Sequence, residues 1–85
     1  HNLRVCEICI TLLEMGLPFA TEVRLRTGVR PDIIAPTHVK PIIEVLWSET
    51  NEDFLEKKAD KYHPDLFGKW ILHNAKNEYV PKLIM

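Results

Sequence analysis

Three short stretches in the middle of the chain have the residue pattern of β-strands. In residues 19–26 apolar or small side chains alternate with mostly charged ones, as in a strand with one buried and one solvated face. Residues 31–34 and 41–47 are rich in isoleucine and valine, which favour a pleated and largely buried surface. The loop at 35–40 has prolines near both ends and suits a hairpin-like reversal between the second and third strands.

Helical periodicity flanks these strands on both sides. In residues 3–15 polar side chains recur at spacings of three and four, which predicts an amphipathic helix that ends at Gly16 and turns its polar stripe to solvent. A second helix is predicted from about Asn51 to Tyr62, because Thr50 and Asp53 approximate a capping box. The polar stripe of the first helix consists of Arg4, Glu7, Thr11 and Glu14.

The last third of the chain adds a fourth strand. Residues 63–65 include a proline that is expected to end the second helix. The mostly apolar residues 69–72 then predict a strand parallel to its sheet neighbour. Residues 79–85 predict an edge strand or a subunit contact, and so short a chain with an apolar tail suggests a homodimer. The order predicts a single α/β domain over residues 1–85, with a mixed sheet flanked by two helices.

Composition places the chain among folded globular domains. Its 85 residues are 46% hydrophobic and 27% charged, and a formal net charge of -1 excludes an overall basic field. No apolar run approaches the ~20 residues of a membrane span, and no secretory signal is recognisable, so we expect a cytoplasmic protein without a membrane partner. Cys6 and Cys9 lack a second cysteine pair for zinc and are expected to be two buried free thiols on one helix.

Two carboxylates stand where the predicted strands should be apolar. Asp32 and Glu44 each lie in an isoleucine-rich run, and pairing of the two runs would bring both side chains together on one sheet face. Buried carboxylates are costly unless a cation lies between them. Magnesium suits such a site, because it is commonly held by one or two carboxylates together with water and substrate phosphate. The pattern predicts Mg²⁺, or Mn²⁺, at Asp32 and Glu44.

A lysine also stands where the second helix should be apolar. At about 100° per residue, Lys58 falls one turn after Phe54 and one turn before Tyr62. Its ammonium either extends past the edge of the sheet into solvent or reaches over the sheet toward the carboxylates. Glu22 is either a third carboxylate of the site or a solvated partner of neighbouring arginines. The candidate phosphate contacts are Arg24, Arg26, Arg30, Lys57 and Lys61.

Taken together, these residues resemble the PD-(D/E)xK, or restriction-endonuclease-like, superfamily of nucleases over roughly residues 1–73. Pro31 and Asp32 match the PD pair, and Glu44 occupies the acidic position of the (D/E)xK tripeptide. The chain departs from the pattern at the lysine of that tripeptide, where it has Leu46. The resemblance implies an α-β-β-β-α-β core.

A large family of small bacterial endonuclease-like proteins within the superfamily is similar to the stretch that follows Asp32. In these proteins the lysine has moved to the helix after the glutamate strand, which here would make it Lys58. The matching positions are Ile43, Glu44, Val45, Leu46, Ser48, Thr50, Asp53, Lys58 and Tyr62, with the serine and aspartate offset by about one residue.

This resemblance implies a metal-dependent endonuclease. Asp32 and Glu44, helped by Glu22, would hold the divalent metal, and Lys58 would act on the attacking water or on the transition state. The basic residues Arg24 and Lys57, with the others of their group, would hold flanking phosphates without reading sequence. The partner expected from the resemblance is nucleic acid, in the form of double-stranded DNA.

Two other interpretations stay open. The leucine at position 46 and the near-neutral charge also suit a non-catalytic module that binds nucleic acid or protein on the same fold. Residues 3–19 resemble the first helix of thioredoxin-fold glutathione transferases, although no strand with a catalytic Ser, Tyr or Cys precedes them here. A Mg²⁺-dependent nicking assay tests the first interpretation, and glutathione binding tests the second.

Overall fold

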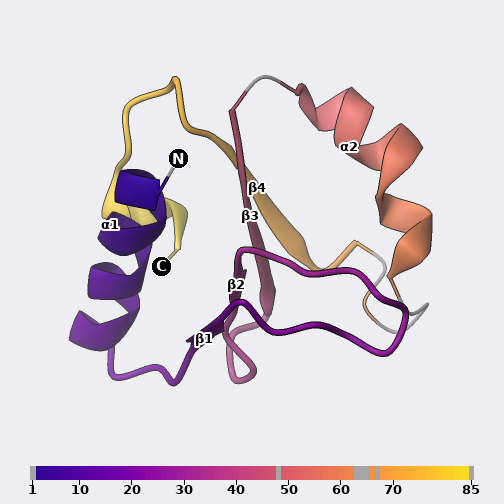
Figure 1. Cartoon of the computed structure of the whole chain (residues 1–85). Coiled ribbons are helices and arrows are strands. Elements are labelled where there is room, and N and C mark those ends of the chain that lie inside the picture. The colour runs from indigo at the N-terminus through magenta and orange to yellow at the C-terminus, as the bar shows by residue number, and fades with distance from the viewer. Residues whose placement is uncertain (1, 48, 63–65, 67, 85) are drawn as a thin grey trace.

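The order of helices and strands along the chain agrees with the sequence pattern. The computed structural model describes residues 2–47, 49–62, 66 and 68–84, so the helix end expected at 63–65 lies outside the described residues. A helix is followed by three strands, a second helix and a fourth strand (Figure 1). The elements are α1 (Asn2–Glu14), β1 (Ala20–Thr21), β2 (Ile33–Ile34), β3 (Ile42–Leu46), α2 (Asn51–Lys57), the 3₁₀-helix η1 (Ala59–Lys61), β4 (Trp70–Asn74) and the 3₁₀-helix η3 (Pro81–Leu83).

The four strands form one mixed sheet in the order β1-β2-β3-β4. The pairs β1–β2 and β2–β3 are antiparallel, whereas β3 and β4 are parallel because α2 lies in the connection between them. Ile33 lies opposite Ile43, a register that places Asp32, one residue before β2, level with Glu44. Helix α1 covers one face of the sheet and α2 the other (Figure 1). The chain therefore has the predicted α/β class, with a mixed sheet flanked by two helices.

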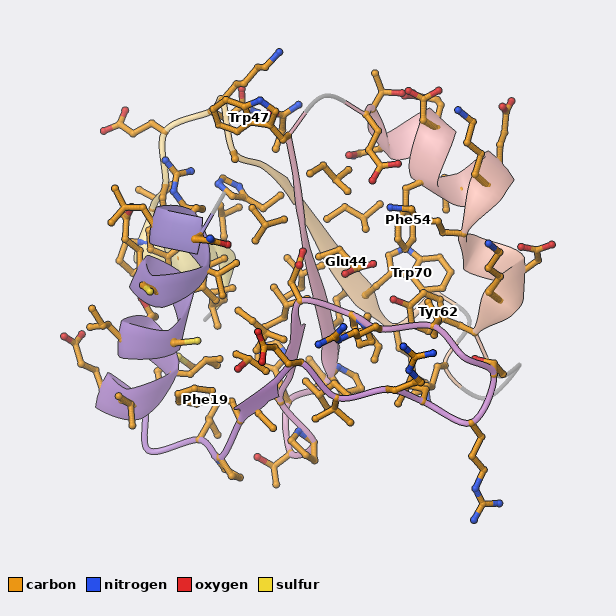
Figure 2. The ribbon with its side chains drawn as sticks, in the orientation of Figure 1. Phe19, Glu44, Trp47, Phe54, Tyr62 and Trp70 are labelled. Carbon is orange, nitrogen blue, oxygen red and sulfur yellow. The ribbon has the colours of Figure 1, made fainter. Side chains whose placement is uncertain are left out.

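The side chains of β3 alternate between the two faces of the sheet, and all of them are buried. Ile43 and Val45 pack under α1, and Ile42 and Leu46 pack under α2, so Glu44 belongs to the α2 face. The α1 side of the core contains Ile8, Leu12, Ile33, Ala35, Ile43, Val45, Ala75 and Ile84. The α2 side contains Ile42, Leu46, Phe54, Tyr62 and Trp70 (Figure 2).

The strand predicted at residues 19–26 is wrong beyond Thr21. Glu22 has a φ of 60°, in the left-handed region that side chains with a Cβ rarely adopt, and this residue ends β1. The chain then forms a loop that closes on itself, with the Leu25 amide donating to the Val29 carbonyl and the Gly28 amide to the Leu25 carbonyl, each at 2.9 Å. Alternation of apolar and polar residues is compatible with a strand. It does not ensure that a neighbouring strand pairs with the whole stretch, and β2 pairs with Ala20 and Thr21 alone.

Helix α2 begins as predicted and ends early. The Asp53 amide donates to Thr50 Oγ1 at 3.2 Å and the Thr50 amide donates to Asp53 Oδ2 at 3.0 Å, which confirms the capping box. The helix ends one residue before Lys58, whose φ of -123° is not helical and whose amide donates to the Phe54 carbonyl. The turn of η1 then carries the chain to Tyr62, which is still buried.

The polar stripe of α1 faces solvent only in part, since Glu14 is exposed but Arg4 and Thr11 contact the C-terminal part of the chain. Arg4 donates hydrogen bonds to the His73 ring and to the Asn77 carbonyl, and the Thr11 and Tyr79 hydroxyl groups lie 2.6 Å apart. Strand β4 supplies His73, and the segment after β4 supplies Asn77 and Tyr79. Nothing near α1 in the sequence indicates these partners. Instead, α1 exposes an apolar stripe that includes Leu3, Ile10 and Leu13. The prediction of two buried thiols on this helix is wrong, because Cys6 is exposed and Cys9 is half-buried, although both are free.

The segment at 79–85 is not an edge strand over its described residues. Its regular part is η3, which begins at Pro81, and the first helical position suits a proline because no amide hydrogen is needed there. Ile84 is buried in the core under α1, whereas Val80 and Leu83 are exposed. Over its described residues, the tail therefore contributes Ile84 to the core rather than a strand to the sheet.

Protonation of His73 should loosen the packing of α1 on β4, because His73 is the partner of Arg4 there. Burial, and then the Arg4 charge, lower the pKa of His73 below its ordinary 6.5, so the folded protein favours the neutral ring. The stability from the neutral ring is fully present above the ordinary pKa of 6.5. It is lost as the pH falls from there through the lower pKa of the folded protein. Between about pH 7.5 and about pH 5.5, the urea midpoint should fall further in wild type than in His73→Gln, which keeps an acceptor for Arg4. An equal fall of the urea midpoint in the two proteins would contradict the link between His73 protonation and stability.

Candidate functional site

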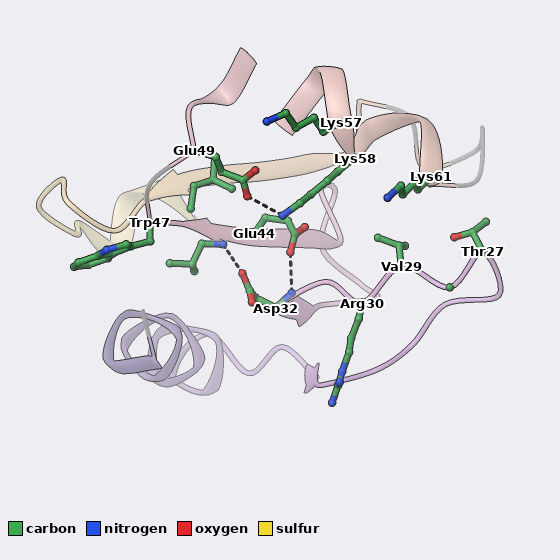
Figure 3. A pocket seen from close by; sticks show the side chains of 13 residues that line it. Thr27, Val29, Arg30, Asp32, Glu44, Trp47, Glu49, Lys57, Lys58 and Lys61 are labelled. Carbon is green, nitrogen blue, oxygen red and sulfur yellow. Dashed lines mark hydrogen bonds and ion pairs between the residues drawn. The ribbon is translucent and has the colours of Figure 1, made fainter. Parts of the chain in front are cut away.

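Asp32 and Glu44 lie side by side on the sheet face that α2 covers, as the sequence predicts. The Asp32 amide donates to Glu44 Oε1 at 2.9 Å, and the Val45 amide donates to Asp32 Oδ2 at 2.7 Å (Figure 3). Each carboxylate is thus fixed by a backbone amide of the neighbouring strand segment. Such fixed carboxylates are preorganised, since little side-chain motion is needed before they bind a ligand.

Glu44 is the more deeply buried of the two carboxylates, with 7% of its surface exposed. The Tyr62 hydroxyl donates to Glu44 Oε2 at 3.0 Å, so both oxygens of this carboxylate accept hydrogen bonds. The Tyr62 ring packs against Phe54 and Trp70 with centroid distances of 6.2 and 5.9 Å, which fixes the position of its hydroxyl. Tyr62 therefore connects the aromatic core under α2 to the carboxylate.

Burial raises the pKa of both carboxyl groups above their ordinary values. The Val45 amide and the Lys58 charge lower the pKa of Asp32, but by less than burial raises it. For Glu44, the charge of Asp32 adds to the effect of burial. Two neighbouring carboxylates whose pKa values are raised by burial favour protons or cations, which is the electrostatic condition for a metal site.

Lys58 points into the same cleft, but its nearest partner is a carboxylate that sequence reasoning missed. Lys58 Nζ lies 2.8 Å from Glu49 Oε1 (Figure 3), and this hydrogen bond, above all, raises the pKa of the lysine. The charge of Lys58 also acts on Asp32 and Glu44, lowering the pKa of each. Glu49 follows closely after β3, the strand that carries Glu44. This closeness in sequence is the feature from which its place in the site could have been predicted.

These groups line one cleft of about 910 Å³ between α2, the end of β3 and the loop before β2. Three further basic side chains, Arg30, Lys57 and Lys61, line it as well. The cleft therefore combines a carboxylate pair with a cationic wall. The full lining is Thr27, Gly28, Val29, Arg30, Asp32, Glu44, Val45, Leu46, Trp47, Glu49, Lys57, Lys58 and Lys61.

Three of the predicted site residues do not line this cleft. Glu22 is exposed and lines a different hollow beside α1, which shares only Arg30 and Asp32 with the cleft. Arg24 and Arg26 are exposed on the loop that replaces the predicted strand, and they line neither hollow. The prediction placed these residues on a strand next to Asp32, and that placement fails because β1 ends at Thr21.

The carboxylate pair offers oxygen donors, which suit a hard divalent cation such as Mg²⁺ or Mn²⁺. Among the described residues, no three side chains of His, Cys, Asp and Glu gather into a group that would hold a metal by itself. Magnesium does not need such a group, because it keeps several waters and takes one or two carboxylates with the phosphate of its substrate. The donors of Asp32 and Glu44 are oxygens only, as this hard cation requires.

Comparisons with known proteins add no relative: no family model matches the chain, and neither do curated proteins or solved structures. Within the described residues, none of the helices has the length and apolar character needed to cross a membrane. The interpretation of the site therefore rests on its own geometry.

Neutralising Glu44 should show the cost of its buried charge. Because burial raises the pKa of Glu44, its contribution to folding is most favourable at low pH and is lost as the pH rises through the folded pKa. Without metal, the stability of Glu44→Gln relative to wild type should therefore be higher at about pH 7.5 than at about pH 4. Urea unfolding at the two pH values measures this difference.

The control for this measurement is Glu56→Gln, since Glu56 is an exposed carboxylate on α2. Any general effect of replacing a carboxylate with an amide will appear in both variants. A relative stability of Glu44→Gln that is the same at both pH values would show that the charge of Glu44 is not costly in the folded protein.

Proposed function

We propose that this chain is a metal-dependent endonuclease domain of the PD-(D/E)xK type, which hydrolyses phosphodiester bonds in nucleic acid. The observation that carries the proposal is the contact between Asp32 and Glu44 on one sheet face, with the Lys58 ammonium in the same cleft. The α-β-β-β-α-β order of the elements supports it, as does the cationic wall beside the carboxylates. Fold alone would not assign an activity.

Asp32 and Glu44 would hold Mg²⁺ or Mn²⁺ in this proposal. When bound, the metal supplies charge stabilisation at the phosphate and lowers the pKa of the attacking water. The residues of the chain provide the rest: the amides of Asp32 and Val45 and the Tyr62 hydroxyl keep the carboxylates oriented. Removal of either carboxylate charge should therefore remove the activity.

Lys58 would stabilise negative charge on the phosphate. Its pKa is raised, chiefly by Glu49, so the ammonium stays protonated at neutral pH. A protonated lysine is suited to donate hydrogen bonds to phosphate or to orient water, and is not suited to accept a proton from water. The ammonium reaches the cleft from the residue after α2, which fits the departure at Leu46, a side chain buried in the core under α2.

A non-catalytic binding module is the second candidate. The specific observation in its favour is Leu46, which occupies the lysine position of the motif and is only 3% exposed. Such a module would bind nucleic acid through Arg30, Lys57 and Lys61 without cutting it. The predicted homodimer belongs to neither proposal in particular and stays a prediction.

Substitutions that keep an acceptor for the partner backbone amide but remove the charge test the enzyme proposal. Asp32→Asn and Glu44→Gln should each lower Mg²⁺-dependent cleavage of plasmid and single-stranded DNA by roughly 100-fold or more. Asp32→Ala is a poorer test, because it leaves the amide of the buried Val45 unpaired, at a cost of about 1–3 kcal/mol.

The readout is cleavage rate with Mg²⁺ and with chelator, accompanied by the thermal midpoint of each variant. Glu56→Gln, exposed on α2, is the matched carboxylate control and should retain wild-type activity. Binding of nucleic acid without cleavage in either Mg²⁺ or Mn²⁺ would refute the enzyme and support the binding module.

The two adjacent lysines of the cleft should separate catalysis from binding. Lys58→Ala should lower kcat by roughly 100- to 1000-fold, because the ammonium is expected to stabilise charge that develops in the reaction. Lys57→Ala should mainly raise KM, since its expected contact is with a flanking phosphate. Steady-state kinetics on one oligonucleotide measures both. Similar effects of the two substitutions on kcat would contradict the role given to Lys58.

A further inference from the structure

An exposed tryptophan stands at one end of the cleft. Trp47 directly follows β3 and lines the same cleft as Asp32, Glu44 and Lys58. In Figure 3 it lies at the opposite end from Lys61, with the carboxylates between them. The cleft therefore has an aromatic side chain at one end and a lysine at the other (Figure 3).

The exposure of Trp47 distinguishes it from the other aromatic side chains around the site. Trp47 is 55% exposed, whereas Trp70 is 9% exposed and packs in the core with Phe54 at a centroid distance of 5.6 Å. Trp70 already has a structural role, and the core under α2 does not include Trp47. An accessible indole next to a cationic groove is the arrangement on which nucleic-acid bases stack.

The position of Trp47 in the sequence would place a base stacked on its indole close to the carboxylates. It comes three residues after Glu44, which corresponds to about 10 Å along an extended strand. Successive phosphates of one strand are about 3.4 Å apart along a stacked helix and farther apart when the strand is extended. A base on the indole therefore belongs to a nucleotide within about three positions of a phosphate held at the carboxylates.

We propose that the cleft binds an unpaired strand of nucleic acid, with one base stacked on Trp47 and phosphates held by Arg30, Lys57 and Lys61. The location of the scissile phosphate rests on the proposed function, but the binding itself does not. In a duplex each base is already stacked on its neighbours, so the indole has no base face to contact unless a base leaves the stack. This substrate class differs from the double-stranded DNA expected from the sequence.

The net charge of the protein agrees with a single nucleic-acid strand that is held partly by base stacking. A formal net charge of -1 provides no general field for a duplex, whose binding depends strongly on phosphate contacts. Stacking adds affinity that needs no further basic residues and tolerates any base. The three cations of the cleft wall are enough to follow a short stretch of backbone.

Binding of one labelled sequence as a single strand and as a duplex, in chelator to prevent cleavage, tests this inference. We expect the single strand to bind at least 10-fold more tightly to wild type. Trp47→Ala should weaken single-strand binding by about 5- to 100-fold and leave duplex binding unchanged, and Trp47→Phe should restore most of the loss. Leu13→Ala, which shortens an exposed side chain on α1, is the control. The inference would be overturned if wild type bound the single strand and the duplex equally well. It would also be overturned if Trp47→Ala lost the same affinity for both.

Oligonucleotides with a single abasic site locate the stacked base. Removal of the base should weaken binding to wild type at one position only, and the loss at this position should disappear in Trp47→Ala, since the two changes remove the same contact. A loss that is independent of position, or that persists in Trp47→Ala, would refute stacking on the indole. Retained thermal midpoints show that each variant is folded.

The failure of this inference is distinguishable from the failure of the proposed function. If wild type cleaves nucleic acid but Trp47→Ala binds and cleaves like wild type, the endonuclease stands and the stacking site falls. If single strands bind through Trp47 but neither Mg²⁺ nor Mn²⁺ supports cleavage, the stacking site stands and the endonuclease falls.

Discussion

The two hydrogen bonds that join Asp32 and Glu44 to the opposite backbone are the interaction on which the fold and the candidate site both depend. The Asp32 amide donates to the Glu44 side chain, and the Val45 amide donates to the Asp32 side chain. These bonds extend the pairing of β2 and β3 past the start of β2, where backbone pairing stops. Because buried amides need acceptors, the carboxylates stabilise the register of the sheet while they face the cleft.

The same carboxylates carry an electrostatic cost that the hydrogen bonds do not remove. The pKa of each remains raised, because burial, together with the charge of Glu49 near Asp32 and the charge of Asp32 near Glu44, outweighs the amide donors, the Tyr62 hydroxyl and the nearby Lys58 charge. A protein selected only for stability would place apolar side chains or amides at these positions. Retention of two costly charges on a well-packed strand is typical of a binding or catalytic site, where stability is exchanged for affinity toward a cation.

The sequence predicts those parts of the fold that depend on neighbouring residues. The β-branched runs around Ile33 and Ile43 and the capping box at Thr50 are local signals, and all appear in the structure. The polar side of α1 was misinterpreted because its partners, such as His73, lie some 70 residues away in sequence. The strand at 19–26 was overextended, since alternation does not reveal the positive φ at Glu22. Asp32 and Glu44 were predictable because their pairing follows from a hairpin register.

Lys58 was placed correctly by a helical angle that the structure does not have, since α2 ends one residue earlier. The ammonium still enters the cleft because the turn into η1 keeps Tyr62 in the core. Lys58 lies in sequence between Phe54 and Tyr62, which are both buried in the core under α2. Its bond to Glu49 joins side chains that are 43% and 26% exposed, and such a pair contributes only about 0–1 kcal/mol. A phosphate that approached the carboxylates with a bound cation would compete well for this ammonium, because phosphate offers several acceptor oxygens and a full negative charge. The Glu49 contact therefore keeps Lys58 protonated and extended into the cleft without holding it too tightly to act there.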